Sequence, residues 1–207
     1  QNIPEAQFNL GCIYSEGEYV PWDIIHYFSL AANQNYPKAQ LFLGYFFYNV
    51  NNINKSIFYF ELAQKNGLKD ADFILGFLYQ EGEYIKRNIK QSIIHYKEAS
   101  SFNNQFAKNN LGIIFKNGIK CIDENGINEE RAGKFEIEPN LGLSIEYLNE
   151  SIRQKCDCVS MYNLSSIYIF NEFDMNYINK SIELLIKSIN NGFKESYDLI
   201  SIVVIKK

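Results

Sequence analysis

The sequence predicts an all-α fold, an α-solenoid of about five helix-turn-helix repeats followed by a closing C-terminal helix. One motif recurs along the chain: a small residue, three spacers, Leu-Gly, two spacers and an aromatic residue. Its third copy is Ala71, Leu75, Gly76 and Tyr79. The Leu positions and one Ile equivalent lie 33, 32, 36, 53 and 36 residues apart, at Leu10, Leu43, Leu75, Leu111, Leu164 and Ile200. Self-similarity at this period is typical of solenoids, in which each unit packs on its neighbours.

Each copy of the motif predicts a first helix. The small residue, the Leu and the aromatic residue are spaced i, i+4 and i+8, which places them on one stripe of a helix. The Gly after the Leu lowers helix propensity by about 1 kcal/mol relative to Ala, so its repeated use predicts close approach of a neighbouring helix. The residues expected to pack the repeats are Ala6, Leu10, Gly11, Tyr14, Ala39, Leu43, Gly44, Phe47, Ala71, Leu75, Gly76, Tyr79, Ala107, Leu111, Gly112, Phe115, Leu164 and Tyr168.

A second stripe in each unit predicts a second helix. In the second unit it consists of Ser56, Phe60 and Ala63, and small residues seven apart indicate a helix that lies close to its partners. A Gly or Asn just past the stripe, such as Gly67 or Asn103, is the expected left-handed cap. The resulting units cover residues 4–36, 37–68, 69–104, 105–156 and 157–193, with a closing helix over 194–205.

The fourth unit carries an acidic, glycine-containing insertion over residues 119–139. Two interpretations remain open: a loop near a binding face, or a disordered expansion without a role. The stretch from Asp123 to Glu130 has some features of a calcium loop. Counted from Asp123, however, positions six and twelve hold Asn128 and Lys134 instead of Gly and Glu. The sequence therefore predicts no calcium site there.

These residues resemble the Sel-one-like repeats, relatives of the tetratricopeptide repeats. That unit is approximately Ala-x3-Leu-Gly-x2-Tyr-x2-Gly, then Ala-x2-Trp/Tyr-x2-Lys-Ala-Ala-x3-Gly. The resemblance covers almost the whole chain and is strongest from Ala71 to Gly82. It departs at Asn49-Val50, where an inter-helix Gly is missing, and at Ser165, which replaces the repeat Gly. It implies a right-handed superhelix and scaffolding roles in signalling or protein-quality-control complexes.

Composition limits the function classes. With 207 residues, 46% of them hydrophobic, the chain can bury one elongated core, and we expect a single domain over 1–207. It contains no run of eighteen apolar residues, which disfavours a membrane span. A net charge of −4 with scattered Lys disfavours a nucleic-acid surface. The abrupt ends predict either an excerpt of a longer protein or termini covered by partners.

The residue types that usually carry chemistry form no recognisable site. The four cysteines are Cys12, Cys121, Cys156 and Cys158. Only the last two are close in sequence, so a structural zinc site lacks its second pair, and the spacing does not follow the repeat. Free thiols are expected, which favours a reducing compartment such as the cytoplasm. His26 and His95 have no evident nucleophile beside them. We therefore predict no catalytic residues, no metal and no cofactor.

The resemblance also predicts a binding face. In tetratricopeptide-like solenoids the first helices line the concave side, so their residues off the packing stripe are expected to face a groove. Together with Cys12, these residues are Phe8, Leu41, Tyr45, Tyr48, Phe73, Phe77, Gln80, Phe106, Asn109, Ile113 and Tyr162. The set is largely apolar and aromatic, as at the centres of protein interfaces. Two interpretations remain open: a groove that holds a peptide with hydrophobic anchors, or ordinary core buried by tight curvature.

The sequence thus predicts a non-catalytic adaptor or scaffold that binds a protein partner through the concave face of a solenoid. The alternative is a structural subunit of a large multiprotein assembly, whose apolar ends would be covered by neighbouring subunits or further repeats. An enzyme is supported only by the scattered Cys and His. No nucleic-acid partner and no membrane insertion are expected, and the sequence does not identify the protein partner.

Overall fold

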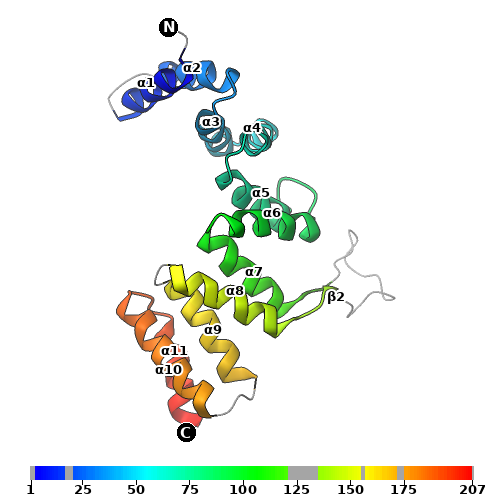
Figure 1. The fold of residues 1–207 in the computed structure, drawn as a ribbon, viewed down its shortest axis with the longest axis vertical. Helices are drawn as coiled ribbons and strands as arrows, with labels where there is room; N and C mark the ends of the chain where they lie inside the picture. Colours follow the sequence, from blue (N-terminus) through cyan, green and yellow to red (C-terminus); the bar gives the residue numbers. More distant parts are fainter. Residues whose placement is uncertain (1–2, 17–20, 121–134, 155–156, 172–174, 207) are drawn as a thin grey trace. The chain divides into compact units, whose positions relative to one another are not determined.

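The computed structural model describes residues 3–16, 21–120, 135–154, 157–171 and 175–206, most of them helical (Figure 1). The helices are α1 (Pro4–Glu16), α2 (Pro21–Asn33), α3 (Pro37–Asn49), α4 (Ile53–Lys65), α5 (Asp70–Glu81), α6 (Ile89–Ser101), α7 (Gln105–Asn117), α8 (Leu141–Gln154), α9 (Cys158–Phe170), α10 (Met175–Asn190) and α11 (Ser196–Lys206). The predicted α-helical repeat fold is confirmed. Within the described residues, no helix has the length and apolar character needed to cross a membrane.

The chain divides into two compact units, residues 1–102 and 103–207, and each is described by itself. In the first unit, α1 packs on α2, α3 on α4 and α5 on α6, and α2 and α4 also contact the first helix of the next pair. In the second unit, α7 packs on α8, α9 on α10, and α11 on both α9 and α10. The helix pairs fall within the predicted repeats, while the single domain over 1–207 stays a prediction.

In the first four repeats, the Gly of the Leu-Gly pair faces a large side chain of its own second helix. The pairs are Gly11–Phe28, Gly44–Phe60, Gly76–Tyr96 and Gly112–Leu148. A Cβ atom added to Gly76 would lie 2.7 Å from the Tyr96 ring, closer than neighbouring atoms tolerate. The missing side chain is therefore what allows the two helices of each repeat to approach each other.

In the second and fourth repeats, a Ser of the second helix donates a hydrogen bond to the carbonyl oxygen of the repeat Gly on the first helix. Ser56 Oγ donates a hydrogen bond to the Gly44 carbonyl oxygen at 2.8 Å, and Ser144 Oγ donates to that of Gly112 at 2.7 Å. The equivalent residue of the third repeat, Ser92, is buried as well. Its Oγ has no hydrogen-bond partner in the part of the chain that the structure describes.

Because Ser56 is hydrogen-bonded and Ser92, within the described residues, is not, we expect the same substitution to change stability differently at the two positions. Ser56→Ala is expected to lower the free energy of unfolding by about 1 kcal/mol, because a buried hydrogen bond is lost. Ser92→Ala is expected to leave the free energy of unfolding unchanged or to raise it, because the substitution removes an unpaired buried hydroxyl. Urea unfolding of both variants, followed by circular dichroism, measures the difference. Equal losses would contradict a stabilising role for the Ser56 hydrogen bond.

The second helices end as predicted, on residues in the left-handed conformation. These residues and their φ angles are Asn35 (60°), Gly67 (90°), Asn103 (67°) and Gly192 (91°). Asn tolerates this conformation better than most residues other than Gly. The second repeat, which lacks the inter-helix Gly, uses Asn51 at φ 58° between its two helices. Asn51, one residue beyond the expected position of the Gly, therefore takes over its left-handed conformation.

The insertion of the fourth repeat begins and ends in short strands. β1 (Ile119–Lys120) pairs antiparallel with β2 (Phe135–Ile137), with Ile119 opposite Ile137. The sequence analysis predicted a loop throughout 119–139 and missed both strands, although β-branched and aromatic residues favour this conformation. The calcium-like stretch over 123–130 lies outside the described residues. The role of the insertion stays open.

Candidate functional site

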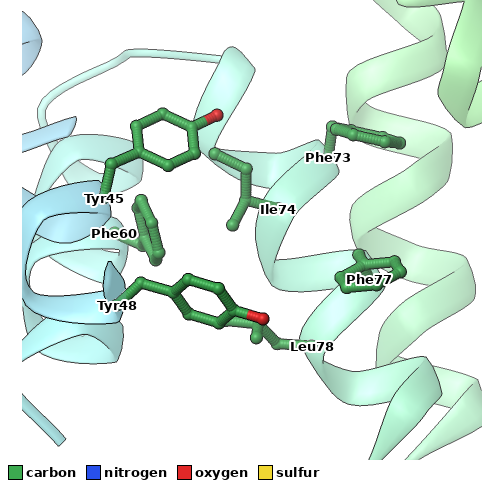
Figure 2. A pocket seen from close by; sticks show the side chains of 7 residues that line it. All are labelled: Tyr45, Tyr48, Phe60, Phe73, Ile74, Phe77 and Leu78. Carbon is green, nitrogen blue, oxygen red and sulfur yellow. The ribbon is translucent and has the colours of Figure 1, made fainter. Parts of the chain in front are cut away.

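An apolar pocket of about 280 Å³ lies on the first unit, beside α3 and α5. It is lined by Tyr45, Tyr48, Phe60, Phe73, Ile74, Phe77 and Leu78. Figure 2 shows the two tyrosines of α3 on one side and Phe73 and Phe77 of α5 on the other. The first helices of the second and third repeats therefore supply six of the seven side chains, and α4 supplies Phe60.

Helix periodicity explains why these aromatic side chains do not enter the core. On α5 the packing stripe consists of Ala71 and Leu75, both buried, whereas Phe73 and Phe77 are four residues apart on an adjacent stripe. Phe77 is 41% exposed, and Tyr45 across the pocket is 47% exposed. The pocket thus has aromatic walls that include the exposed rings of Tyr45 and Phe77, together with the buried side chains of Phe60 and Leu78.

The core holds one wall of the pocket in a defined geometry. Phe60 is almost fully buried, and its ring meets the Tyr45 ring edge to face with 5.3 Å between centroids. Tyr48 meets the ring of Tyr84 in the same way at 5.8 Å. Edge-to-face pairs at these separations are favourable aromatic contacts. The two tyrosines are therefore preorganised by neighbouring rings.

Two carboxylates lie at the rim of the pocket. Burial raises the pKa of the Tyr45 phenol above its ordinary value, and the nearby charge of Asp70 raises it further. A hydrogen bond with Glu83 is the largest cause that raises the pKa of Tyr84, followed by burial and by the Glu83 charge. Asp70 and Glu83 are both exposed, and within the described residues neither is paired with a cation. These two carboxylates therefore place negative charge near the α3 wall of the pocket, although neither of them lines it.

The structure brings four residues predicted for the binding face into the pocket: Tyr45, Tyr48, Phe73 and Phe77. The other predicted residues of the first unit lie elsewhere. Phe8 packs on Phe28 with ring centroids 5.4 Å apart, and Cys12 packs against the same core cluster. Leu41 is half-buried against the cluster around Phe60, and Gln80 is half-buried near the end of α5. These four do not line the pocket.

In the second unit the residues predicted for this face differ in exposure. They are Phe106, Asn109, Ile113 and Tyr162. Phe106 is exposed, whereas Ile113 and Tyr162 are half-buried. Asn109 is buried, and its Oδ1 accepts hydrogen bonds from Ser160 Oγ at 3.0 Å and Asn163 Nδ2 at 3.1 Å. Asn109 therefore joins α7 to α9 and is not open to a partner.

Most of the residues expected to pack the repeats are buried: Gly11, Ala39, Leu43, Gly44, Ala71, Leu75, Gly76, Ala107, Leu111, Gly112, Phe115, Leu164 and Tyr168. Phe47 and Tyr79 are half-buried, and the Tyr14 side chain lies outside the described part. Ala6 and Leu10 are exposed, contrary to the expectation. The reason is the position of each helix: the equivalent face of α3 packs against α2 of the preceding repeat, whereas α1 contacts mainly α2 of its own repeat.

The sequence analysis missed a column of buried polar residues. In the first four repeats, the residue directly after the small residue is polar and buried: Gln7, Gln40, Asp72 and Lys108. Gln34 Nε2 donates to Gln7 Oε1 at 2.6 Å, and Asn66 Nδ2 donates to Gln40 Oε1 at 2.9 Å. The sequence does contain a signal for this column: a polar residue directly follows the small residue of the motif in each of the first four repeats.

Asp72 and His95 form a contact that the sequence did not predict. His95 Nδ1 lies 3.0 Å from Asp72 Oδ1, which also accepts a hydrogen bond from Gln64 Nε2 at 3.2 Å. The Tyr79 ring stacks on the His95 ring with centroids 5.6 Å apart. Neither Asp72 nor His95 lines the pocket. The pair joins α5 to α6 while Gln64 adds α4, which indicates a structural role.

The lysines of α7 tie it to other helices of the second unit. Lys108 Nζ lies 3.3 Å from a carboxylate oxygen of Glu150 on α8. Lys116 Nζ donates to Ser166 Oγ on α9 at 2.7 Å, and burial lowers the pKa of Lys116.

Cys12 and Cys158 are the cysteines in the described part of the chain and both are half-buried, while Cys121 and Cys156 lie outside the described residues. A search of the described residues found no group of three or more His, Cys, Asp or Glu side chains placed to hold a metal ion.

Three features define an α-solenoid repeat protein: paired helices, a period of 32 to 36 residues in the regular repeats, and, in the first four repeats, a Gly that faces a large side chain of the second helix. The Sel1 repeat family matches residues 4–36, 37–68 and 69–101. The chain thus contains three Sel1 repeats, and these three matches coincide with the first three helix pairs. Sel1 repeats generally mediate interactions between proteins.

Solved structures extend the similarity in fold beyond the matched repeats. A Sel1 repeat protein from Oxalobacter formigenes is similar with a TM-score of 0.70 and 22% identity, over 92% of this chain and 74% of that one. A sel1 repeat protein from Klebsiella pneumoniae is similar with a TM-score of 0.52 and 16% identity, over 97% of this chain and 93% of that one. At these identities the similarity shows the fold alone.

Two curated proteins are similar over part of the chain. DAP3-binding cell death enhancer 1 of Rattus norvegicus is 31% identical over 87 residues, which is 41% of this chain and 17% of that protein. A sel1-like repeat-containing protein of Acanthamoeba polyphaga mimivirus is 31% identical over 116 residues, which is 55% of this chain and 21% of that protein. The chain thus spans about a fifth of the length of these relatives.

Proposed function

We propose that this chain is a non-catalytic adaptor that binds another protein through the apolar pocket of its first unit. The observation that carries the proposal is the half-exposed aromatic wall around that pocket, chiefly Tyr45 and Phe77. Large aromatic side chains leave water favourably on binding and are frequent energetic centres of interfaces. The general role of Sel1 repeats in protein interactions supports the same conclusion.

The rigidity of the pocket also favours binding. Its walls stand on helices, and the Tyr45 ring rests against buried Phe60. A partner would therefore order few side chains on this surface, which lowers the entropic cost of association.

The chemistry of the pocket favours contact rather than catalysis. The only polar groups on the seven lining side chains are the hydroxyls of Tyr45 and Tyr48. A surface of this kind suits the burial of an apolar side chain from a partner. Proton transfer or nucleophilic attack usually needs a base beside a reactive group. We therefore propose binding without a chemical step.

A pull-down with the intact chain tests the proposal. The chain is immobilised, incubated with an extract of the source organism and compared with the double variant Tyr45→Ala/Phe77→Ala by quantitative mass spectrometry. We expect one or a few proteins to be depleted at least about tenfold in the variant, since interface anchors commonly contribute more than 1 kcal/mol each. Retention of every captured protein by the variant would contradict the proposal.

The control is a double variant that removes exposed apolar side chains elsewhere on the same unit. Phe58 on α4 is 57% exposed and Ile94 on α6 is 50% exposed, and neither lines the pocket. Phe58→Ala/Ile94→Ala should therefore retain the captured proteins. Thermal unfolding of both double variants, followed by circular dichroism, checks that loss of binding is not loss of fold. Unfolding of Tyr45→Ala/Phe77→Ala at room temperature would instead assign these two rings to the core.

A second candidate function is a structural subunit of a large assembly. The apolar side chains of Leu10 and Ile13 on α1 are 40% and 62% exposed, and the equivalent Leu43 and Leu75 are buried inside repeat interfaces. The exposed face of α1 therefore has the composition of an interface. Leu10→Glu/Ile13→Glu should shift the chain from a large to a small species in size-exclusion chromatography of cell extract. An unchanged elution position would eliminate this candidate.

A further inference from the structure

The geometry points to the chemistry of the partner. We infer that the pocket takes one large apolar side chain from a peptide segment that carries Lys or Arg on either side of this anchor. The inference rests on the proposed function and makes it more specific. It is carried by the size of the pocket and by the charges at its rim.

The size of the pocket fits one anchor side chain. An apolar cavity of about 150 Å³ is large enough to bind benzene. The pocket, at about 280 Å³, has room for an aromatic or leucine side chain and part of its backbone. Pockets for drug-sized molecules are usually about 300–1,000 Å³ and hold several placed polar groups. This pocket offers two phenol hydroxyls, so it suits an apolar side chain better than a polar small molecule.

The charges near the pocket are complementary to a basic segment. Asp70 lies close enough to Tyr45 on the α3 wall to act on its phenol, and Glu83 lies beside Tyr84, whose ring contacts Tyr48. Of the three acidic residues of α5, Asp70 and Glu81 are exposed and Asp72 is buried against His95, and the helix contains neither Lys nor Arg. A positive charge on each side of the anchor would therefore meet a carboxylate. Such complementarity directs partner choice and speeds association.

Two basic residues next to α5 contact groups other than Asp70 and Glu83. Lys69, which directly precedes Asp70, places its Nζ 4.8 Å from the centroid of the Phe102 ring. Arg87 Nε donates a hydrogen bond to the Gln80 carbonyl oxygen at 3.2 Å. Neither contact joins a cation to Asp70 or Glu83, and both carboxylates are exposed.

The test uses fluorescein-labelled seven-residue peptides and the intact 207-residue chain, measured by fluorescence polarisation at low salt. The central residue is Phe, Leu or Ala, and the residues two positions away on each side are Lys, Ser or Glu, with Ser elsewhere. We expect Phe or Leu at the centre to bind at least about tenfold more tightly than Ala. We expect Lys flanks to bind roughly twofold to tenfold more tightly than Glu flanks, with a difference that shrinks as salt is added.

Two variants assign the effect to the pocket and its rim. Asp70→Lys/Glu83→Lys should reverse the flank preference in favour of Glu and keep the need for a large central residue. Tyr45→Ala/Phe77→Ala should abolish the central preference. Circular dichroism confirms that each variant is folded. The Phe58→Ala/Ile94→Ala variant should behave as the unchanged chain.

The possible results separate this inference from the proposed function. Equal binding of Lys, Ser and Glu flanks, or a preference for Glu, would overturn the inference while the pull-down result stands. Absence of binding by any peptide, together with pocket-dependent capture in the pull-down, would also overturn it, because the occupant would then not be a short segment. Peptide binding and protein capture that both persist in Tyr45→Ala/Phe77→Ala would overturn the proposed function itself.

Discussion

Gly76→Leu is expected to destabilise the first unit by about 3 kcal/mol or more, which would leave much of the protein unfolded at moderate temperature. Even the first carbon of the new side chain would lie 2.7 Å from the Tyr96 ring. Tyr96 is fully buried, so its ring cannot move into solvent without opening the core. Urea unfolding followed by circular dichroism gives the change in the free energy of unfolding.

The matched control for this prediction is Gly142→Leu. Gly142 is also a helical glycine, but it is exposed, and an added Cβ would meet only the side chain of Asn140 at 3.4 Å. This substitution should leave stability unchanged or raise it slightly, because Leu favours helix more than Gly does. A similar loss in both variants would show that helix propensity, not the contact with Tyr96, determines the effect.

The fifth repeat has a different pair of residues at this contact. There Ser165 stands in place of the glycine, and the aligned second-helix residue is Leu185 instead of an aromatic residue. Because Gly76 and Tyr96 are in direct contact, the cost of Gly76→Ser should change by about 1 kcal/mol in a Tyr96→Leu background. A double-mutant cycle measures this coupling, and a coupling near zero would contradict direct contact between the two positions.

Leu75→Ala is expected to lower the free energy of unfolding by about 2–5 kcal/mol, while Leu10→Ala, at the same repeat position, should lower it by less than about 1 kcal/mol. Leu75 is fully enclosed between repeats, so its removal leaves a cavity, whereas Leu10 is 40% exposed. Both changes delete the same atoms from the same type of helix. Equal losses would mean that the face of α1 is covered in solution.

The glycines and the left-handed caps that repeat with the solenoid period were predictable from the sequence. A Gly that recurs at a position where it weakens a helix must serve packing, and the structure places Tyr96 directly over Gly76. The cap at Gly67 was predictable for a similar reason, since few residues adopt a positive φ of 90°. Such positions are constrained by local geometry, and the constraint is visible in one sequence.

Other features depend on contacts that one sequence does not display. The pairing of Asp72 with His95 joins residues 23 positions apart and follows no repeated spacing. Leu10 and Leu75 occupy the same position in the motif, and whether each is buried depends on which helices pack against its own helix. Similarly, four of the five aromatic residues of the pocket were predicted for the binding face together with Asn109, which the structure buries among other polar side chains.

The central claim, that a protein partner occupies the pocket of the first unit, is tested most directly by photo-crosslinking from the pocket itself. A photo-reactive phenylalanine analogue is placed at Phe77, at Tyr45 or, as control, at Phe58, and the chain is irradiated in an extract of the source organism. We expect the same protein to be crosslinked from positions 45 and 77 and not from 58, with the crosslinked peptide containing a large apolar residue near Lys or Arg. Crosslinks that are no stronger from positions 45 and 77 than from 58 would contradict the claim.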